Sequence, residues 1–228
     1  GEMDYRGYFR EEDAKAYTAR LEAGGYETHL GGTDAYSTLG FFHDPVLNTF
    51  AGYPEIDFAE LIFHELTHRR VFRKGDTTFN ESLANTVAEE GVRRWLASKG
   101  RLADLAGYEE RLIRRRDFYR EIETTRRELD DLYASALPEA EMRKRKRAVF
   151  AKLKARARAL QRRWGGKQLG EWLRTDLTNA HLLPLITYHS EIGSFRKLLA
   201  ESGGDFEAFF RKAEEMDPNS LKTETNEP

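Results

Sequence analysis

The sequence predicts an α+β fold, in which a small sheet accompanies a pair of helices and a long helical hairpin is inserted after them. Three observations support this prediction. Short runs near the N-terminus lie between turn-forming residues as strands do, residues 55–99 carry two helix-length apolar patterns, and residues 102–164 show helical spacing among dense mixed charge. With 228 residues, the chain can bury one good core with an appendage, but it is too short for two full enzyme domains.

The N-terminal part of the chain is expected to supply the sheet. Its predicted strands cover residues 5–9, 26–30 and 35–39, each bounded by turn-forming residues. A helix is expected over residues 11–22, and it ends where two consecutive glycines follow. Together these elements predict a small sheet beside the helices that come next.

A buried helix expected over residues 55–71 carries His64, Glu65 and His68. Residues four apart lie on one face of a helix, so both imidazoles should point to a common position. Neutral imidazole is a good zinc ligand, and Glu65 can reach a water molecule held at an open position of the metal. The spacing therefore predicts a zinc site with its catalytic base. The alternative is a structural polar cluster without metal, which would be costly to bury.

The third zinc ligand is expected on a second helix, over residues 77–99, after a turn at Gly75. The candidates on that helix are Glu81, Glu89 and Glu90. When a short turn joins two antiparallel helices, residues equidistant from the turn face each other. This geometry places Glu81 opposite His68 and selects it as the ligand.

The same register gives expectations for the neighbouring positions. Asn85 should face His64, where it can hydrogen-bond the nitrogen that does not bind metal and fix the imidazole tautomer. Glu89 should lie opposite Glu60 and so meet a carboxylate instead of an imidazole. Glu89 and Glu90 are expected to support the site or lie at the surface, and either could meet a substrate amine.

Several separated blocks of the sequence resemble the bacterial putative aminopeptidase family. The blocks are residues 5–9, 35–40, 64–68, 75–82 and 187–189, with Phe195, Leu198 and Leu199 after them. Two His on one helix and a Glu on the next are also similar to the thermolysin-like gluzincin peptidases, although the interval before the Glu is shorter here. The resemblance implies a zincin-like catalytic core that holds Zn²⁺ and takes a peptide substrate.

The resemblance also implies roles for residues outside the two helices. Tyr36, Ser37 and Thr38 would form an edge strand that pairs with the substrate backbone, and an ordinary sheet strand is the alternative. Tyr188 would stabilise the oxyanion that develops during peptide hydrolysis, because related zincins use a Tyr or His from a C-terminal segment. His189 is the second choice for this role.

The segment over residues 102–164 is expected to form an antiparallel helical hairpin with a break at Pro138. Residues 101–165 contain 19 Lys and Arg against 11 Asp and Glu, whereas residues 1–100 contain 11 against 17. The basic cluster at residues 143–147 would suit nucleic acid or an anionic membrane. However, no aromatic residues interleave it, and acids of the opposing arm could pair with it. We therefore favour a solvated, salt-bridged hairpin and expect no nucleic-acid partner.

These elements predict three parts of the chain. Residues 1–100 would form the catalytic core, residues 101–165 the charged hairpin, and residues 166–228 a helical part that completes the core. Within the last part, an apolar run over residues 177–186 should return through the core. Two closing helices are expected over residues 190–200 and 205–215.

Composition limits the remaining possibilities. Because the sequence has no cysteine, only His and carboxylate side chains are plausible zinc ligands. No apolar run approaches the length of a membrane span, and the N-terminus has no hydrophobic export segment. Members of the resembling family usually begin with an export or lipoprotein segment. The resemblance therefore suggests a trimmed N-terminus and a place in the bacterial cell envelope or periplasm; oligomeric state is not predicted.

The sequence as a whole predicts a zinc-dependent peptidase, aminopeptidase-like by resemblance, in which Glu65 activates the zinc-bound water. The rival interpretation is a non-enzymatic binding module with a structural or vestigial zinc site and a hairpin that binds a partner. An open coordination position favours the enzyme, whereas a fourth protein ligand favours the binding module.

Overall fold

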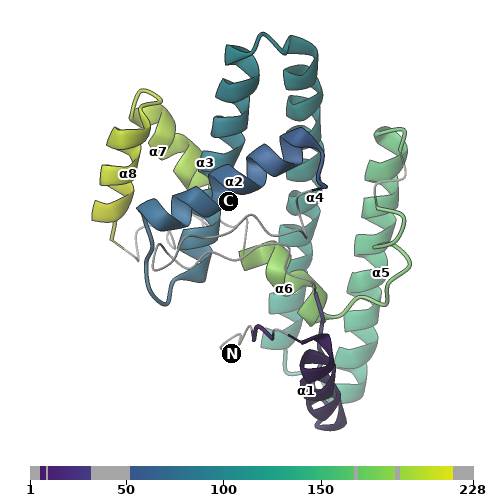
Figure 1. Ribbon diagram of the computed structural model, residues 1–228. Helices are drawn as coiled ribbons and strands as arrows, with labels where there is room; N and C mark the ends of the chain where they lie inside the picture. The colour runs from purple at the N-terminus through teal and green to yellow at the C-terminus, as the bar shows by residue number, and fades with distance from the viewer. Residues whose placement is uncertain (1–5, 9, 32–51, 167–168, 188–190, 218–228) are drawn as a thin grey trace. The chain divides into compact units, whose positions relative to one another are not determined.

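A computed structural model describes residues 6–8, 10–31, 52–166, 169–187 and 191–217, and every regular element in these ranges is an α-helix (Figure 1). The helices are α1 (Glu11–Ala23), α2 (Glu55–Arg70), α3 (Thr77–Ser98), α4 (Leu102–Ala134), α5 (Glu139–Arg163), α6 (Asn179–Thr187), α7 (Ile192–Glu201) and α8 (Phe206–Glu215). The chain divides into two units, residues 1–32 with 120–184 and residues 33–119 with 185–228. This division differs from the predicted three-part organisation, which stays a prediction.

The predicted α+β fold class is wrong for the residues that the structure describes, because none of them lies in a strand. The described part of the first predicted strand, residues 6–8, is irregular, and the third, residues 35–39, lies outside the described ranges. In the second, residues 26–30, the apolar side chains of Tyr26 and Leu30 are exposed. An extended segment needs a partner strand to complete its hydrogen bonds.

Residues 26–30 are held by side-chain contacts instead of by pairing with another strand. The Thr28 hydroxyl donates to Glu22 of α1 at 2.6 Å, and Lys146 of α5 forms an ion pair with Glu27. The other Glu27 oxygen accepts from the backbone N–H of Asn179 at 3.0 Å. Residues 26–30 therefore form an irregular connection that is anchored by the Glu27 carboxylate.

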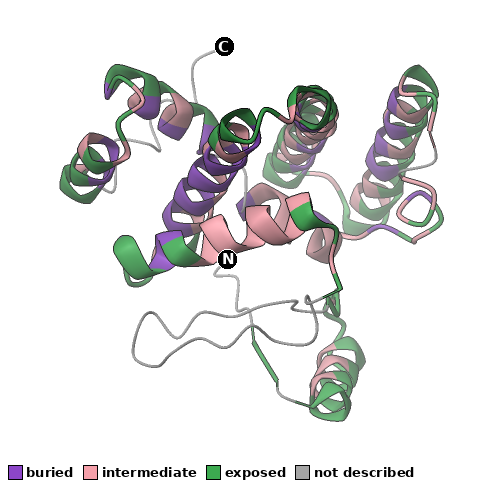
Figure 2. Cartoon of the chain, turned by 45° about the horizontal axis from the view of Figure 1, so that its top comes forward, coloured by how far each residue is buried: buried purple, intermediate pink, exposed green. Residues whose placement is uncertain are grey.

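Helix α3 is the centre of the second unit, because buried side chains occur along most of its length. Its N-terminal half contributes Phe79, Leu83 and Val87 to a core shared with α7 and α8. Its C-terminal half contributes Val92 and Leu96 to a core shared with α2 and the start of α4. Figure 2 shows this burial as the purple helix behind α2. The position of α3 fixes which of its faces is presented to α2.

The turn between α2 and α3 is fixed by backbone-directed hydrogen bonds. Asn80 accepts from the backbone N–H of Arg73 and donates to the carbonyl of the same residue, both at 2.8 Å. Asp76 caps α3 by accepting from the backbone N–H of Phe79 at 3.1 Å. Gly75 has a φ of 81°, a conformation that glycine adopts without strain. These contacts set the register between the two helices.

Close packing of α2 on α3 depends on Gly91. A Cβ atom at this position would lie 2.7 Å from Cγ of Phe63, the residue that precedes His64. Gly91→Ala should therefore displace the Phe63 ring and lower the free energy of unfolding by about 1–3 kcal/mol. The measurement is chemical denaturation.

The matched control for that substitution is Gly107→Ala. Gly107 lies in α4, where an added Cβ atom would meet nothing within 4 Å. This change should raise stability by roughly 0.5–1 kcal/mol, because Ala is favoured over Gly inside a helix. If both variants changed stability in the same direction and by the same amount, the proposed contact with Phe63 would have no role.

In the first unit, α5 lies against the C-terminal part of α4. The guanidinium of Arg156 forms ion pairs with Glu121 at 2.8 Å and Glu128 at 3.0 Å, and it donates to the Thr125 hydroxyl at 2.8 Å. Apolar residues recur along one face of α5 and are buried: Val149, Phe150, Leu153, Ala157 and Leu160.

No helix within the described ranges has both the length and the apolar character that crossing a bilayer requires.

Candidate metal centre

Three side chains from α2 and α3 converge on one position. The Nε2 atoms of His64 and His68 are 3.1 Å apart, and the rings meet edge to face. From α3, the Glu81 carboxylate lies 3.1 Å from Nε2 of His64 and 3.7 Å from Nε2 of His68. All three ligand atoms fall within 4.8 Å of one another. His68 is buried, and the other two residues are partly buried, as a small site shielded from solvent requires.

Asn85 lies opposite His64, as the register between α2 and α3 predicted. Its Oδ1 lies 3.1 Å from Nδ1 of His64. Because an amide oxygen can only accept, Nδ1 of His64 carries a hydrogen and donates it. Nε2 is then the nitrogen turned toward Glu81 and His68, and it is the atom that can bind a metal.

The two imidazoles have opposite pKa shifts. Burial lowers the pKa of His64, but the hydrogen bond and charge of Glu81, with a contribution from Glu65, outweigh it, so the pKa lies above its ordinary value. Burial and the neighbouring charge of His64 lower the pKa of His68 to about 4. Without metal and below the raised pKa of His64, the site therefore carries the additional proton on His64, next to Glu81, while His68 stays neutral above its lowered pKa.

This asymmetry predicts how many protons zinc displaces. At about pH 5.5, two ordinary imidazoles would carry nearly two protons, whereas this pair should carry about one, on His64. Zinc added to chelator-treated protein should release that proton, and the number should fall as pH rises through the raised pKa of His64. Titration calorimetry in buffers of different ionisation enthalpy measures it. Release of nearly two protons would contradict the assigned pKa directions.

Next to the three converging side chains, arginines from α4 neutralise Glu60. Arg115 pairs with one Glu60 oxygen at 2.6 Å, and Arg111 lies 3.3 Å from the other. Burial lowers the pKa of Arg115, but Glu60 outweighs it, and Glu89 adds to the rise. Cations from α4 therefore balance Glu60, and the charge of Arg115 also acts on Glu89, the carboxylate that was predicted to lie opposite Glu60.

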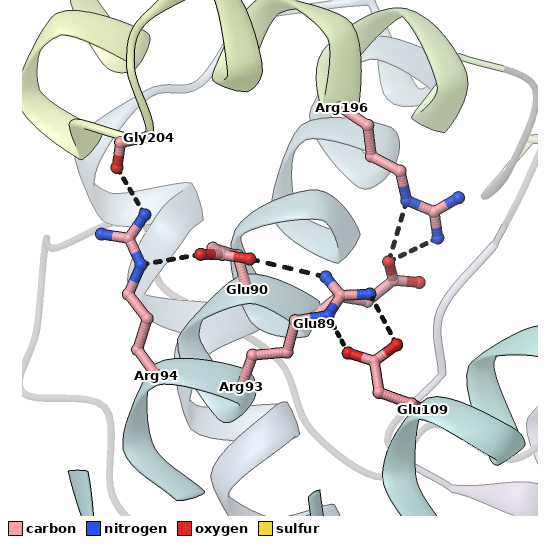
Figure 3. Close-up of polar contacts among 7 residues, drawn as sticks. All are labelled: Glu89, Glu90, Arg93, Arg94, Glu109, Arg196 and Gly204. Carbon is pink, nitrogen blue, oxygen red and sulfur yellow. Dashed lines mark hydrogen bonds and ion pairs between the residues drawn. The ribbon is translucent and has the colours of Figure 1, made fainter. Parts of the chain in front are cut away.

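Glu89 is paired across α3 and α7. Its side chain is only 2 % exposed, and its Oε2 accepts from Nη2 of Arg196 at 2.5 Å and from Nε at 3.1 Å. Figure 3 shows Arg196 reaching from α7 to Glu89, while Glu90 is bound by Arg93 and Arg94 of its own helix. Glu89 thus holds α7 against α3, a role that the sequence analysis missed. Because 107 positions separate the partners, no local pattern could have indicated it.

The remaining predicted site residues lie outside the described ranges. These are Tyr36, Ser37, Thr38, Tyr188 and His189. A described contact lies close to the last two along the chain, where the backbone N–H of Glu191 donates to the Ser82 hydroxyl at 3.3 Å. Ser82 follows Glu81 directly, so the start of α7 is tied to the turn of α3 that carries this carboxylate.

The sequence matches the family described as putative aminopeptidase over residues 1–227, which is nearly the whole chain. The chain belongs to this family. No curated protein and no solved structure matches it. Membership of the putative aminopeptidase family indicates a peptidase, and the side chains of the site determine which chemistry is available to it.

Proposed function

We propose that this member of the putative aminopeptidase family is a zinc-dependent peptidase, with His64, His68 and Glu81 as the zinc ligands. The convergence of these three side chains is the observation that carries the proposal. Two imidazole nitrogens and one carboxylate form a common donor set of catalytic zinc sites, which keep another position open. Asn85 supports the set by orienting His64 through its other ring nitrogen.

Glu65 is the proposed general base. The support is that it follows the first proposed zinc ligand on α2, that it is partly buried, and that its charge contributes to the raised pKa of His64. When bound, zinc would polarise the scissile carbonyl and make water acidic enough to react near neutral pH. Glu65 would take a proton from the attacking water and pass it to the leaving amine.

Tyr188 is proposed to donate to the oxyanion that develops on the substrate, with His189 as the second candidate. The support is the attachment of Glu191 to Ser82, because it holds the chain three residues after Tyr188 next to the helix turn of Glu81. Residues 36–38 are proposed to pair with the substrate backbone as an extended segment.

The direct test of function is hydrolysis of a panel of amino-acid anilides and internally quenched peptides, with and without a chelator. The proposal expects hydrolysis that the chelator removes and that zinc restores. Cleavage of the anilides would assign an aminopeptidase, and cleavage of the quenched peptides alone an endopeptidase. Stoichiometric zinc with no hydrolysis of any substrate would favour a binding module and contradict the proposal.

The ligand role of Glu81 has its own test. Glu81→Ala should weaken zinc binding by roughly one to two orders of magnitude or more, because the site loses its only proposed anionic ligand. Competition with a chromophoric chelator measures the affinity. Glu90→Ala is the matched control, since that carboxylate is bound by Arg93 and Arg94. Unchanged zinc affinity in Glu81→Ala would remove this residue from the ligand set.

A further inference from the structure

Helix α5 presents a strongly basic face. Over Glu139–Arg163, it has 11 Lys and Arg and two acidic residues, both in its first turn. Its apolar residues are buried along one side, and Figure 2 shows the two sides of the helix as purple and green. Between the basic residues, the exposed face carries only small apolar side chains: Ala148, Ala151, Ala155 and Ala159.

Four of these cations form a line along the helix. Arg147, Lys154, Arg158 and Arg162 follow one another at intervals of seven, four and four residues, which keeps them on one side of an α-helix. The line is roughly 22 Å long at the rise of an α-helix. We call these four residues the basic stripe. Within the part of the chain that the structure describes, none of the four forms an ion pair, and three of them are exposed.

Six acidic residues of α4 and α5 are engaged with basic residues outside the stripe. On α4, Glu123 and Asp130 pair with arginines of α4 itself. Glu121 and Glu128 do reach α5, but they meet Arg156, which faces α4. In the first turn of α5, the two acids pair with residues 143–145. The described ion pairs therefore leave the charge of the stripe uncompensated.

We propose that the basic stripe of α5 binds the surface of an anionic phospholipid bilayer. A row of cations on a straight helix can meet a flat anionic surface along its whole length, and each basic residue then contributes roughly fivefold in affinity. Alanines between the cations let the helix approach the headgroups closely. Because the exposed face has no large apolar residue to insert, binding is electrostatic and is reversed by salt.

Duplex nucleic acid fits this face less well. A helix that enters the major groove fills most of its width of about 12 Å, and it contacts phosphates on both sides. One side of α5 is covered by buried apolar packing, so the four cations of the basic stripe face one way only. The stripe also lacks aromatic side chains on which single-stranded bases could stack.

The test is sedimentation of the full chain with vesicles made of equal parts phosphatidylglycerol and phosphatidylcholine, at low salt. The protein should bind these vesicles, stay free of pure phosphatidylcholine vesicles, and dissociate at about 1 M salt. Replacing all four stripe residues with Gln should weaken binding by roughly 600-fold, about fivefold for each charge removed. The variant should keep its circular dichroism spectrum, because Gln is also a good helix former.

The control variant removes the same charge from scattered, exposed positions. It carries Arg20→Gln, Lys99→Gln, Arg116→Gln and Arg211→Gln, and it should lose far less affinity than the stripe variant. Equal losses in both variants would show a general charge effect and overturn the stripe as a site. Absence of binding to the anionic vesicles, or tighter binding to duplex DNA than to them at the same salt, would also overturn the proposal. None of these outcomes depends on peptidase activity.

Discussion

Replacing Glu65 with Gln should reduce peptide hydrolysis by roughly three orders of magnitude, because general-base catalysis contributes on this scale. Glutamine keeps the shape of the side chain but cannot accept the proton of the attacking water. The zinc content should remain that of the unaltered protein, since His64, His68 and Glu81 are untouched. Initial rates on the peptide panel and metal analysis of the same preparation measure both quantities.

Glu55→Gln is the control for this substitution. Glu55 lies on the same helix, but it is exposed and paired with Arg101. Its loss should leave the hydrolysis rate within a factor of about two, as expected for an exposed ion pair remote from the site. Hydrolysis retained by Glu65→Gln in a clean preparation would contradict the assigned base, and loss of zinc from that variant would make Glu65 part of the metal site.

Replacing Arg196 with Ala should lower the free energy of unfolding by about 3–5 kcal/mol, the largest stability change that we expect in the chain. The reason is that the almost fully buried carboxylate of Glu89 would lose the guanidinium that binds it through two nitrogens. Denaturant unfolding measures the change. Lys197→Ala, at the exposed neighbouring position on α7, should stay within roughly 0.5 kcal/mol of the unaltered protein.

A double substitution separates loss of the charge partner from loss of packing. Arg196→Met combined with Glu89→Leu removes both charges and keeps similar volume, so it should recover much of the stability. An Arg196→Ala variant as stable as Lys197→Ala would show that Glu89 is solvated or paired in another way. Loss of the pair should also reduce zinc affinity, because α7 is tied to the turn of α3 that carries Glu81.

Most helices could be predicted from local signals in the sequence, whereas α6 was expected only as an apolar run, because Pro184 lies inside it. Helices α2 and α3 lie within about one residue of their expected ends. Their antiparallel register, read from a short turn at Gly75, placed Glu81 beside both imidazoles and Asn85 beside His64. Because the turn is short, it allows few alternative registers, so the residues that face each other could be found from their equal distances along the chain from Gly75.

The strand predicted over residues 26–30 is wrong, because a short run between turn-forming residues does not reveal whether a partner strand is present. The carboxylate of Glu27, bound by Lys146 and by the backbone of Asn179, decides the conformation there. Long-range pairs such as Glu89 with Arg196 were missed for the same reason. Their energetics depend on burial, which no local pattern shows.

The convergence of His64, His68 and Glu81 on one zinc ion is tested most directly by a crystal grown with zinc and measured at the zinc absorption edge. We predict one anomalous peak about 2.0–2.2 Å from Nε2 of both imidazoles and from a carboxylate oxygen of Glu81, with no fourth protein ligand. A peak elsewhere, or a Glu81 carboxylate turned away from the ion, would contradict the proposed metal centre.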